Sequence, residues 1–162
     1  MRSFLAIFCL FVCLSWTEAN EVSQDFQVVK GANKTYFIYP QKTLFLEGFF
    51  VCEDSGLDLL TIDSEEENKE VTSEVASTGY KTFWTSGVNL NEKGNDWVWL
   101  NLLDQSNPTP ITYFHWKQGQ PTPVTPASSC ILFTKDDLEG TWSNVNCKEE
   151  HIPICQSYIS PI

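Results

Sequence analysis

The chain has 162 residues, of which 42% are hydrophobic, and its 10 Lys and Arg residues are outnumbered by 21 Asp and Glu residues, giving a formal net charge of −11 at pH 7. Nucleic acids and anionic membranes bind proteins through clustered positive charge, so this composition argues against both as partners. The length suits a single domain with a sizeable hydrophobic core.

The N-terminal segment has the features of a secretory signal peptide. Arg2 precedes an apolar run over residues 4–14, and Ala19 ends a short polar stretch. This order predicts a signal peptide over residues 1–19 and a secreted mature domain over residues 20–162. A retained membrane anchor is the alternative, but the run is far shorter than the ~20 residues that span a bilayer.

The first predicted elements of the mature domain are two strands around a turn. Residues 26–29 and 36–39 alternate apolar and polar side chains, and Gly31 lies between them. Such a pattern is typical of a hairpin. The turn contains an N-glycosylation sequon that begins at Asn33, so we expect Asn33 at the surface.

A helix is predicted over residues 43–53. Phe45, Phe49 and Cys52 recur at helical spacing and define one buried face, and Gly56 is the stop signal. A cysteine on the inner side of a helix is well placed for a bridge to a distant strand.

A second helix is predicted to follow Ser64, which forms a capping box with Glu67. Val71 and Val75 supply its buried stripe, and Gly79 ends it. The helix dipole favours acidic residues in the first turn, so we interpret these residues as a solvated face. A calcium site would need carboxylates that converge, which a helix N-terminus does not arrange by itself.

Two further strands are predicted over residues 81–88 and around Trp97 and Trp99, whose alternation places both indoles on one face. Residues 100–129 show no periodicity and contain five prolines. A loop of this length is usually functional or disordered. The aromatic residues 113–116 are expected to anchor it to the core, and the tryptophans of the mature chain are expected to pack there too.

The C-terminal part predicts a hairpin and a final strand. Residues 131–133 and Trp142 belong to the two strands of the hairpin, and Gly140 lies in or near its turn. Residues 151–156 form the last strand.

Four cysteines remain after the predicted cleavage: Cys52, Cys130, Cys147 and Cys155. In an extracellular chain this even number favours two disulfides over free thiols. Four cysteines allow three pairings, and their spacing alone does not choose among them.

In their order and spacing, these features resemble the C-type lectin-like domain in its short form, a secreted single-domain type common in insects. The resemblance covers nearly the whole mature chain. Besides the four cysteines, it rests on Phe83-Trp84-Thr85-Ser86-Gly87, Trp97-Val98-Trp99, Tyr113-Phe114-His115-Trp116, Gly119-Gln120-Pro121 and Gly140-Thr141-Trp142.

The resemblance implies an α+β fold with two helices, two small antiparallel sheets and a long loop region. It also implies the disulfide pairing, with Cys52 joined to Cys155 and Cys130 joined to Cys147. In sugar-binding members of the family, one Ca²⁺ is held between the long loop and a neighbouring strand, and the same groups contact the sugar hydroxyls.

Carried over to this chain, the calcium- and sugar-binding positions are Gln120, Thr122, Ser128, Ser143 and Asn144. Gln120 matches the family's galactose-type pattern, and the resemblance implies a cis peptide bond before Pro121. All five positions are neutral here, whereas Ca²⁺ takes 6–8 oxygen ligands and gains affinity from their charge. We therefore expect weak or absent Ca²⁺ binding and no cofactor.

Asp136, Asp137 and Glu139 lie close to these positions in sequence but do not match them. We interpret them as residues of the hairpin turn. Their use as substitute calcium ligands is the alternative, because they would supply the missing charge.

The resemblance implies a secreted protein that binds a carbohydrate or glycoprotein, in roles such as microbial recognition in innate immunity. The alternative is a calcium-independent module that binds a protein partner. An enzyme is disfavoured because the two histidines, His115 and His151, form no zinc or nucleophile motif. A Ser-His-Asp arrangement is recognised by geometry and stays open at this point.

Overall fold

The computed structural model describes residues 26–91, 96–101, 108–123, 125, 129–136 and 139–159. The predicted signal peptide lies outside these residues. The elements in chain order are β1 (Gln27–Lys30), β2 (Lys34–Ile38), α1 (Phe45–Asp54), β3 (Asp58–Leu59), α2 (Glu65–Glu74), β4 (Thr82–Asn89), β5 (Trp97–Trp99), β6 (Thr109–Pro110), β7 (Cys130–Lys135), β8 (Gly140–Val145) and β9 (Ile152–Tyr158).

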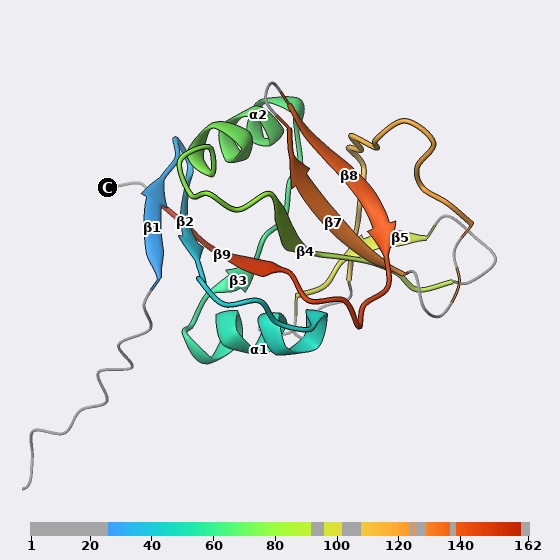
Figure 1. Ribbon diagram of the computed structural model, residues 1–162, viewed down its shortest axis with the longest axis horizontal. Helices are drawn as coiled ribbons and strands as arrows, with labels where there is room; N and C mark the ends of the chain where they lie inside the picture. Colours follow the sequence, from blue (N-terminus) through green and yellow to red (C-terminus); the bar gives the residue numbers. More distant parts are fainter. Residues whose placement is uncertain are drawn as a thin grey trace, which may run out of the picture.

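The strands form one mixed sheet between two helices (Figure 1). Its main path runs β1-β2-β9-β4-β5-β6, while β3 pairs with β9, and β7 and β8 branch from β4. The expected α+β fold with two helices is confirmed, but the two sheets are not separate. A short parallel pairing between β4 and β9, with Phe83 opposite Ile152, joins them.

Each helix covers its own part of the core, and Figure 1 places α1 and α2 on opposite sides of β4 and β9. Val71 of α2 and Val75, which caps its C-terminus, are fully buried in a cluster with Trp97 and Trp99, so the two indoles share one face as predicted. Val98 lies in the second cluster, beneath α1. Among the described residues, no helix is both long and apolar enough to cross a bilayer.

Helix α1 presents the predicted face, because Phe45, Phe49 and Cys52 are all buried. The helix begins two residues later than expected, since Thr43 instead pairs with His151 in an isolated β-bridge. Gly56 follows its C-terminus with a φ of 69°, a conformation that glycine adopts without steric cost.

Helix α2 begins where the capping signal predicts. The Ser64 hydroxyl accepts a hydrogen bond from the Glu67 backbone N–H at 3.2 Å. The Glu67 carboxylate accepts from the backbone N–H of Asp63 at 2.7 Å rather than from Ser64, so the capping box is only half formed. The helix ends at Glu74, before the predicted stop at Gly79, which has a φ of 76° in the following turn.

The N-terminal hairpin is fastened to α2 by buried polar contacts. Lys34 is only 5% exposed and forms an ion pair with Glu67. The Tyr36 hydroxyl donates to the Glu70 carboxylate at 2.8 Å. Burial, together with the contact to Glu70, raises the pKa of Tyr36 far above its ordinary value. Asn33 is exposed in the turn of this hairpin, as predicted.

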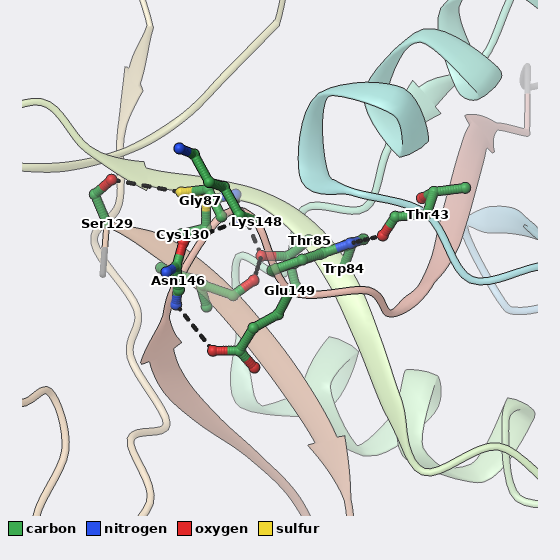
Figure 2. Close-up of a disulfide and its surroundings, with 11 residues drawn as sticks. Thr43, Trp84, Thr85, Gly87, Ser129, Cys130, Asn146, Lys148 and Glu149 are labelled. Atoms are coloured by element: carbon green, nitrogen blue, oxygen red, sulfur yellow. Dashed lines mark hydrogen bonds between the residues drawn. A yellow bond between two sulfur atoms is a disulfide. The ribbon is translucent and has the colours of Figure 1, made fainter. Parts of the chain in front are cut away.

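Both implied disulfides are present, each with a Cα–Cα distance of 5.3 Å. Cys52 is joined to Cys155 over a sequence separation of 103, and Cys130 to Cys147 over 17. Chain-entropy arguments assign roughly 4–5 and 3 kcal/mol to loops of these lengths. Figure 2 shows the second bridge, where the Ser129 hydroxyl lies 3.5 Å from the Cys147 sulfur.

Asn68 of α2 is a buried polar anchor between the helix and the β7–β8 hairpin. Its Nδ2 donates to the Gly140 carbonyl at 2.8 Å, and its Oδ1 accepts from the Trp142 indole N–H at 2.9 Å. The side chain is thereby satisfied in a position where only 2% of the residue is exposed. An unpaired polar group in this interior would be costly.

We expect Asn68→Ala to lower the free energy of unfolding by about 2–4 kcal/mol, because the Trp142 indole and the Gly140 carbonyl both lose their partner. Urea denaturation followed by tryptophan fluorescence measures this. Lys69→Ala, on the exposed face of the same helix, is the control and should change stability by less than about 0.5 kcal/mol. Equal stabilities for the two variants would contradict the role of Asn68 as a buried polar anchor.

His151 lies at the other side of the core, with its ring 4.8 Å from the Trp84 ring and its Nδ1 3.0 Å from the Thr82 hydroxyl. Burial lowers the pKa of His151, and the hydrogen bond to Glu149 opposes this shift only in part, while Lys42 adds to it. The folded state therefore binds this proton less readily than the unfolded state does.

The free energy of unfolding should consequently fall as the pH drops below about 6.5, the unfolded-state pKa, toward the lower folded-state pKa. In His151→Gln this part of the pH dependence should disappear. Urea titrations between about pH 4.5 and 7.5 test this, with His115→Gln, a change nearer the surface, as control. The histidine account fails if His151→Gln keeps the wild-type slope.

Candidate functional site

The segment after Ile111 runs along the edge of β8 that does not pair with β7. The Trp142 backbone N–H donates to the His115 carbonyl at 2.9 Å, and the Lys117 N–H donates to the Trp142 carbonyl at 2.8 Å. Trp116 and Trp142 form a parallel β-bridge. The expectation that residues 113–116 anchor the long loop is therefore confirmed, and the anchor is backbone pairing as well as aromatic packing.

A turn then brings the proline motif back toward the strand. Gly119 has a φ of 80°, and the Gln120 N–H donates to the Lys117 carbonyl at 2.9 Å. The peptide bond between Gln120 and Pro121 is cis, as the resemblance implies. This turn places residues 120–122 against Asn144 of β8.

Gln120, Thr122 and Asn144 form a closed network of hydrogen bonds. Asn144 Oδ1 accepts from the Thr122 N–H at 2.7 Å and from the Thr122 hydroxyl at 3.1 Å, and Asn144 Nδ2 donates to the Thr122 carbonyl at 3.1 Å. Gln120 Oε1 accepts from the N–H groups of Thr122 and Asn144, each at 3.3 Å. The network thus binds the loop to the strand through neutral groups.

Three of the five implied positions therefore come together. Ser143 is half-buried and points to the opposite face of β8 from Asn144, because side chains alternate along a strand. It does not join the network. Ser128 lies outside the residues that the structure describes.

The chemistry of the network does not fit a divalent cation. Its side-chain oxygens are neutral, and Gln120 Oε1 and Asn144 Oδ1 already accept internal hydrogen bonds. The N–H groups that donate to these oxygens occupy lone pairs that a cation would need. Ca²⁺ needs 6–8 oxygens and is bound tightly by carboxylates, which this network lacks.

The alternative acidic ligands lie at the far end of the β7–β8 hairpin. Asp136 accepts from the Thr141 hydroxyl at 3.1 Å, and the Glu139 carboxylate lies 3.2 Å from His115 Nε2. Asn144 is four residues beyond Gly140 on β8, which corresponds to about 13 Å along an extended strand. Asp136 and Glu139 are thus turn residues, while Asp137 lies outside the described residues. Within the described ranges, no three His, Cys, Asp or Glu residues are grouped to hold a metal.

The tryptophans are packed as predicted with one partial exception. Trp84, Trp97, Trp99 and Trp142 are at most 4% exposed, whereas Trp116 is half-buried. Phe114 is the exposed aromatic residue of the segment, at 38%. Sequence reasoning treated residues 113–116 as a single anchor, and alternation does not distinguish the exposed Phe114, because Tyr113 and Trp116 both pack against the core.

Residues 41–157 match the family model described as the Lectin C-type domain. The chain belongs to the C-type lectin domain family. This match includes all four paired cysteines and the whole Gln120–Thr122–Asn144 network.

Among curated proteins, the C-type lectin domain of this chain is similar to part of Lymphocyte antigen 75 from Mus musculus, with 28% identity over 111 residues. That alignment covers 68% of this chain but only 6% of the relative. The chain therefore spans a small fraction of the length of this relative.

Two solved structures show the same fold. The C-type lectin domain of murine dendritic cell inhibitory receptor 2 in complex with N-glycan is 22% identical, with a TM-score of 0.66 over 82% of this chain and 96% of that chain. A calcium-independent type II antifreeze protein is 19% identical, with a TM-score of 0.65 over 82% of this chain and 92% of that chain. At these identities the likeness concerns the fold alone.

The network predicts a specific effect of Asn144→Ala. The Thr122 N–H would lose its shortest hydrogen bond, so its amide exchange with solvent should become at least about tenfold faster while the core amides keep their protection. Ser143→Ala on the same strand is the matched control and should leave Thr122 unchanged. Unaltered protection of Thr122 in Asn144→Ala would show that the network does not hold the loop.

Proposed function

We propose that the protein is a secreted, lectin-like binding protein that recognises carbohydrate without bound calcium. The observation that carries the proposal is the neutral network of Gln120, Thr122 and Asn144 at the position where sugar-binding relatives hold metal and sugar. Its internal hydrogen bonds fix the loop, a task that a metal ion would otherwise share.

The network keeps groups that suit sugar hydroxyls. Thr122 is exposed and Gln120 is half-buried, and the Gln120 amide nitrogen makes no hydrogen bond to another described residue. Amide and hydroxyl groups can donate to and accept from the hydroxyls of a neutral sugar. A polyanionic glycan is disfavoured, since the chain carries a net charge of −11.

Two structural neighbours support this proposal. One structural neighbour is named as a complex with N-glycan, and another is named as calcium-independent. Secretion after removal of residues 1–19, a glycan on the exposed Asn33 and a role in innate immunity belong to the same proposal. Binding rather than catalysis is proposed because the family supplies a recognition domain.

A calcium-independent module that recognises a protein is the second candidate. The observation that favours it is the same closed network, because Asn144 is only 5% exposed and its amide is engaged within the loop. A protein partner would then bind the exposed surface of the loop through shape complementarity rather than through a metal ion.

A glycan array probed with the secreted chain, in about 1 mM Ca²⁺ and in excess chelator, tests the proposal. We expect the same sugars to bind under both conditions, and we expect calorimetry to detect no micromolar Ca²⁺ binding. A sugar signal that the chelator abolishes, or micromolar Ca²⁺ binding lost in Asn144→Ala, would overturn the metal-free account. Absence of sugar binding, together with a protein captured from body fluid, would favour the second candidate.

A further inference from the structure

Phe114 is an exposed aromatic side chain with rigid support. Its ring lies 5.7 Å from the Trp116 ring at an interplanar angle of 16°, and 6.4 Å from the Trp142 ring. Trp116 packs in turn on Trp97 at 5.1 Å. Phe114 is therefore the outer member of an aromatic stack whose inner members belong to the core.

This stack and the polar network lie on one face of the β8 edge. Trp116 and Trp142 are bridge partners, so their side chains project to the same side. The Phe114 ring lies within 6.4 Å of both of these rings, so it lies beside them. Asn144, two residues beyond Trp142, returns to the same face, and Gln120 and Thr122 are bonded to it.

The order along this face is thus Phe114, Trp116 with Trp142, and then the network. Trp142 and Asn144 are two residues, or about 6.6 Å, apart along β8. The Phe114 ring lies 6.4 Å from the Trp142 ring, so the outer ring and Asn144 are separated by up to roughly 13 Å. This span is longer than one pyranose ring. It suits a ligand made of several linked sugars.

We propose that Phe114, supported by Trp116, is a stacking platform for one pyranose ring of a neutral oligosaccharide. The C–H face of that ring packs on the Phe114 ring, while hydroxyls of a neighbouring sugar bond to the Gln120 amide and the Thr122 hydroxyl. This inference rests on the proposed carbohydrate recognition and names the ligand class and the surface that binds it.

Two physical features favour such a platform. An aromatic side chain that is already held in its stack loses little conformational entropy when a ligand binds. The platform also replaces, in part, the affinity that a metal would supply, since apolar contact on a ring needs no charge. Among the described residues of segment 108–123, Phe114 is the exposed large hydrophobic side chain.

The test titrates the secreted chain, in chelator, with neutral sugars of one to three residues. The probes are galactose, lactose, N-acetyllactosamine, a branched mannotriose and chitotriose. Phe114→Ala removes the platform, and Phe114→Trp retains it. Phe50→Ala is the matched control, because Phe50 is 50% exposed on α1, remote from this edge. Unchanged thermal unfolding establishes that each variant is folded.

We expect the probe that binds wild type to bind Phe114→Ala at least about tenfold more weakly, a loss of about 1.4 kcal/mol. Phe114→Trp and Phe50→Ala should keep wild-type affinity, and galactose alone should bind more weakly than the longer probes. If wild type binds a probe and Phe114→Ala binds it equally well, the platform is wrong and carbohydrate recognition stands. If wild type binds no probe or array glycan, the proposed function fails and the platform falls with it.

Discussion

Trp142 is the residue on which the arrangement of the site depends. Its backbone N–H and carbonyl both pair with the loop segment 115–117, and its indole N–H is bonded to Asn68 of α2. Its ring meets those of Trp99, Tyr113, Phe114 and Trp116. One residue of β8 therefore joins the helix, the sheet and the loop, because its two peptide groups bond to the loop segment and its indole N–H bonds to the helix.

The candidate site is a consequence of that junction. With segment 115–117 fixed along β8, the turn at Gly119 returns residues 120–122 to Asn144, where the polar groups of loop and strand satisfy one another. A site closed in this way is rigid before it meets a ligand, and pre-organisation of this kind reduces the entropy lost on binding. It also leaves neutral groups, rather than carboxylates, to meet the ligand.

Local patterns in the sequence predicted the elements but not how they meet. The spacing of Phe45, Phe49 and Cys52 predicted the buried face of α1, and alternation predicted the shared face of Trp97 and Trp99. The disulfide pairing followed only from the family resemblance. The parallel link between β4 and β9, the short strand β6 and the pairing of residues 115–117 with β8 depend on contacts between distant segments. The resemblance likewise gave five site positions, but only the geometry shows that Gln120, Thr122 and Asn144 bond to one another while Ser143 faces away.

The central claim is that the loop is held by neutral side chains without a metal ion. The most direct measurement is a titration of the isotope-labelled chain with Ca²⁺, followed through the side-chain amide resonances of Gln120 and Asn144 and the backbone amide of Thr122. The account predicts that these resonances, already in hydrogen-bonded positions in a chelator, stay unchanged up to about millimolar Ca²⁺. Saturable shifts of all three at micromolar Ca²⁺ would contradict it, because they would require a metal at the network.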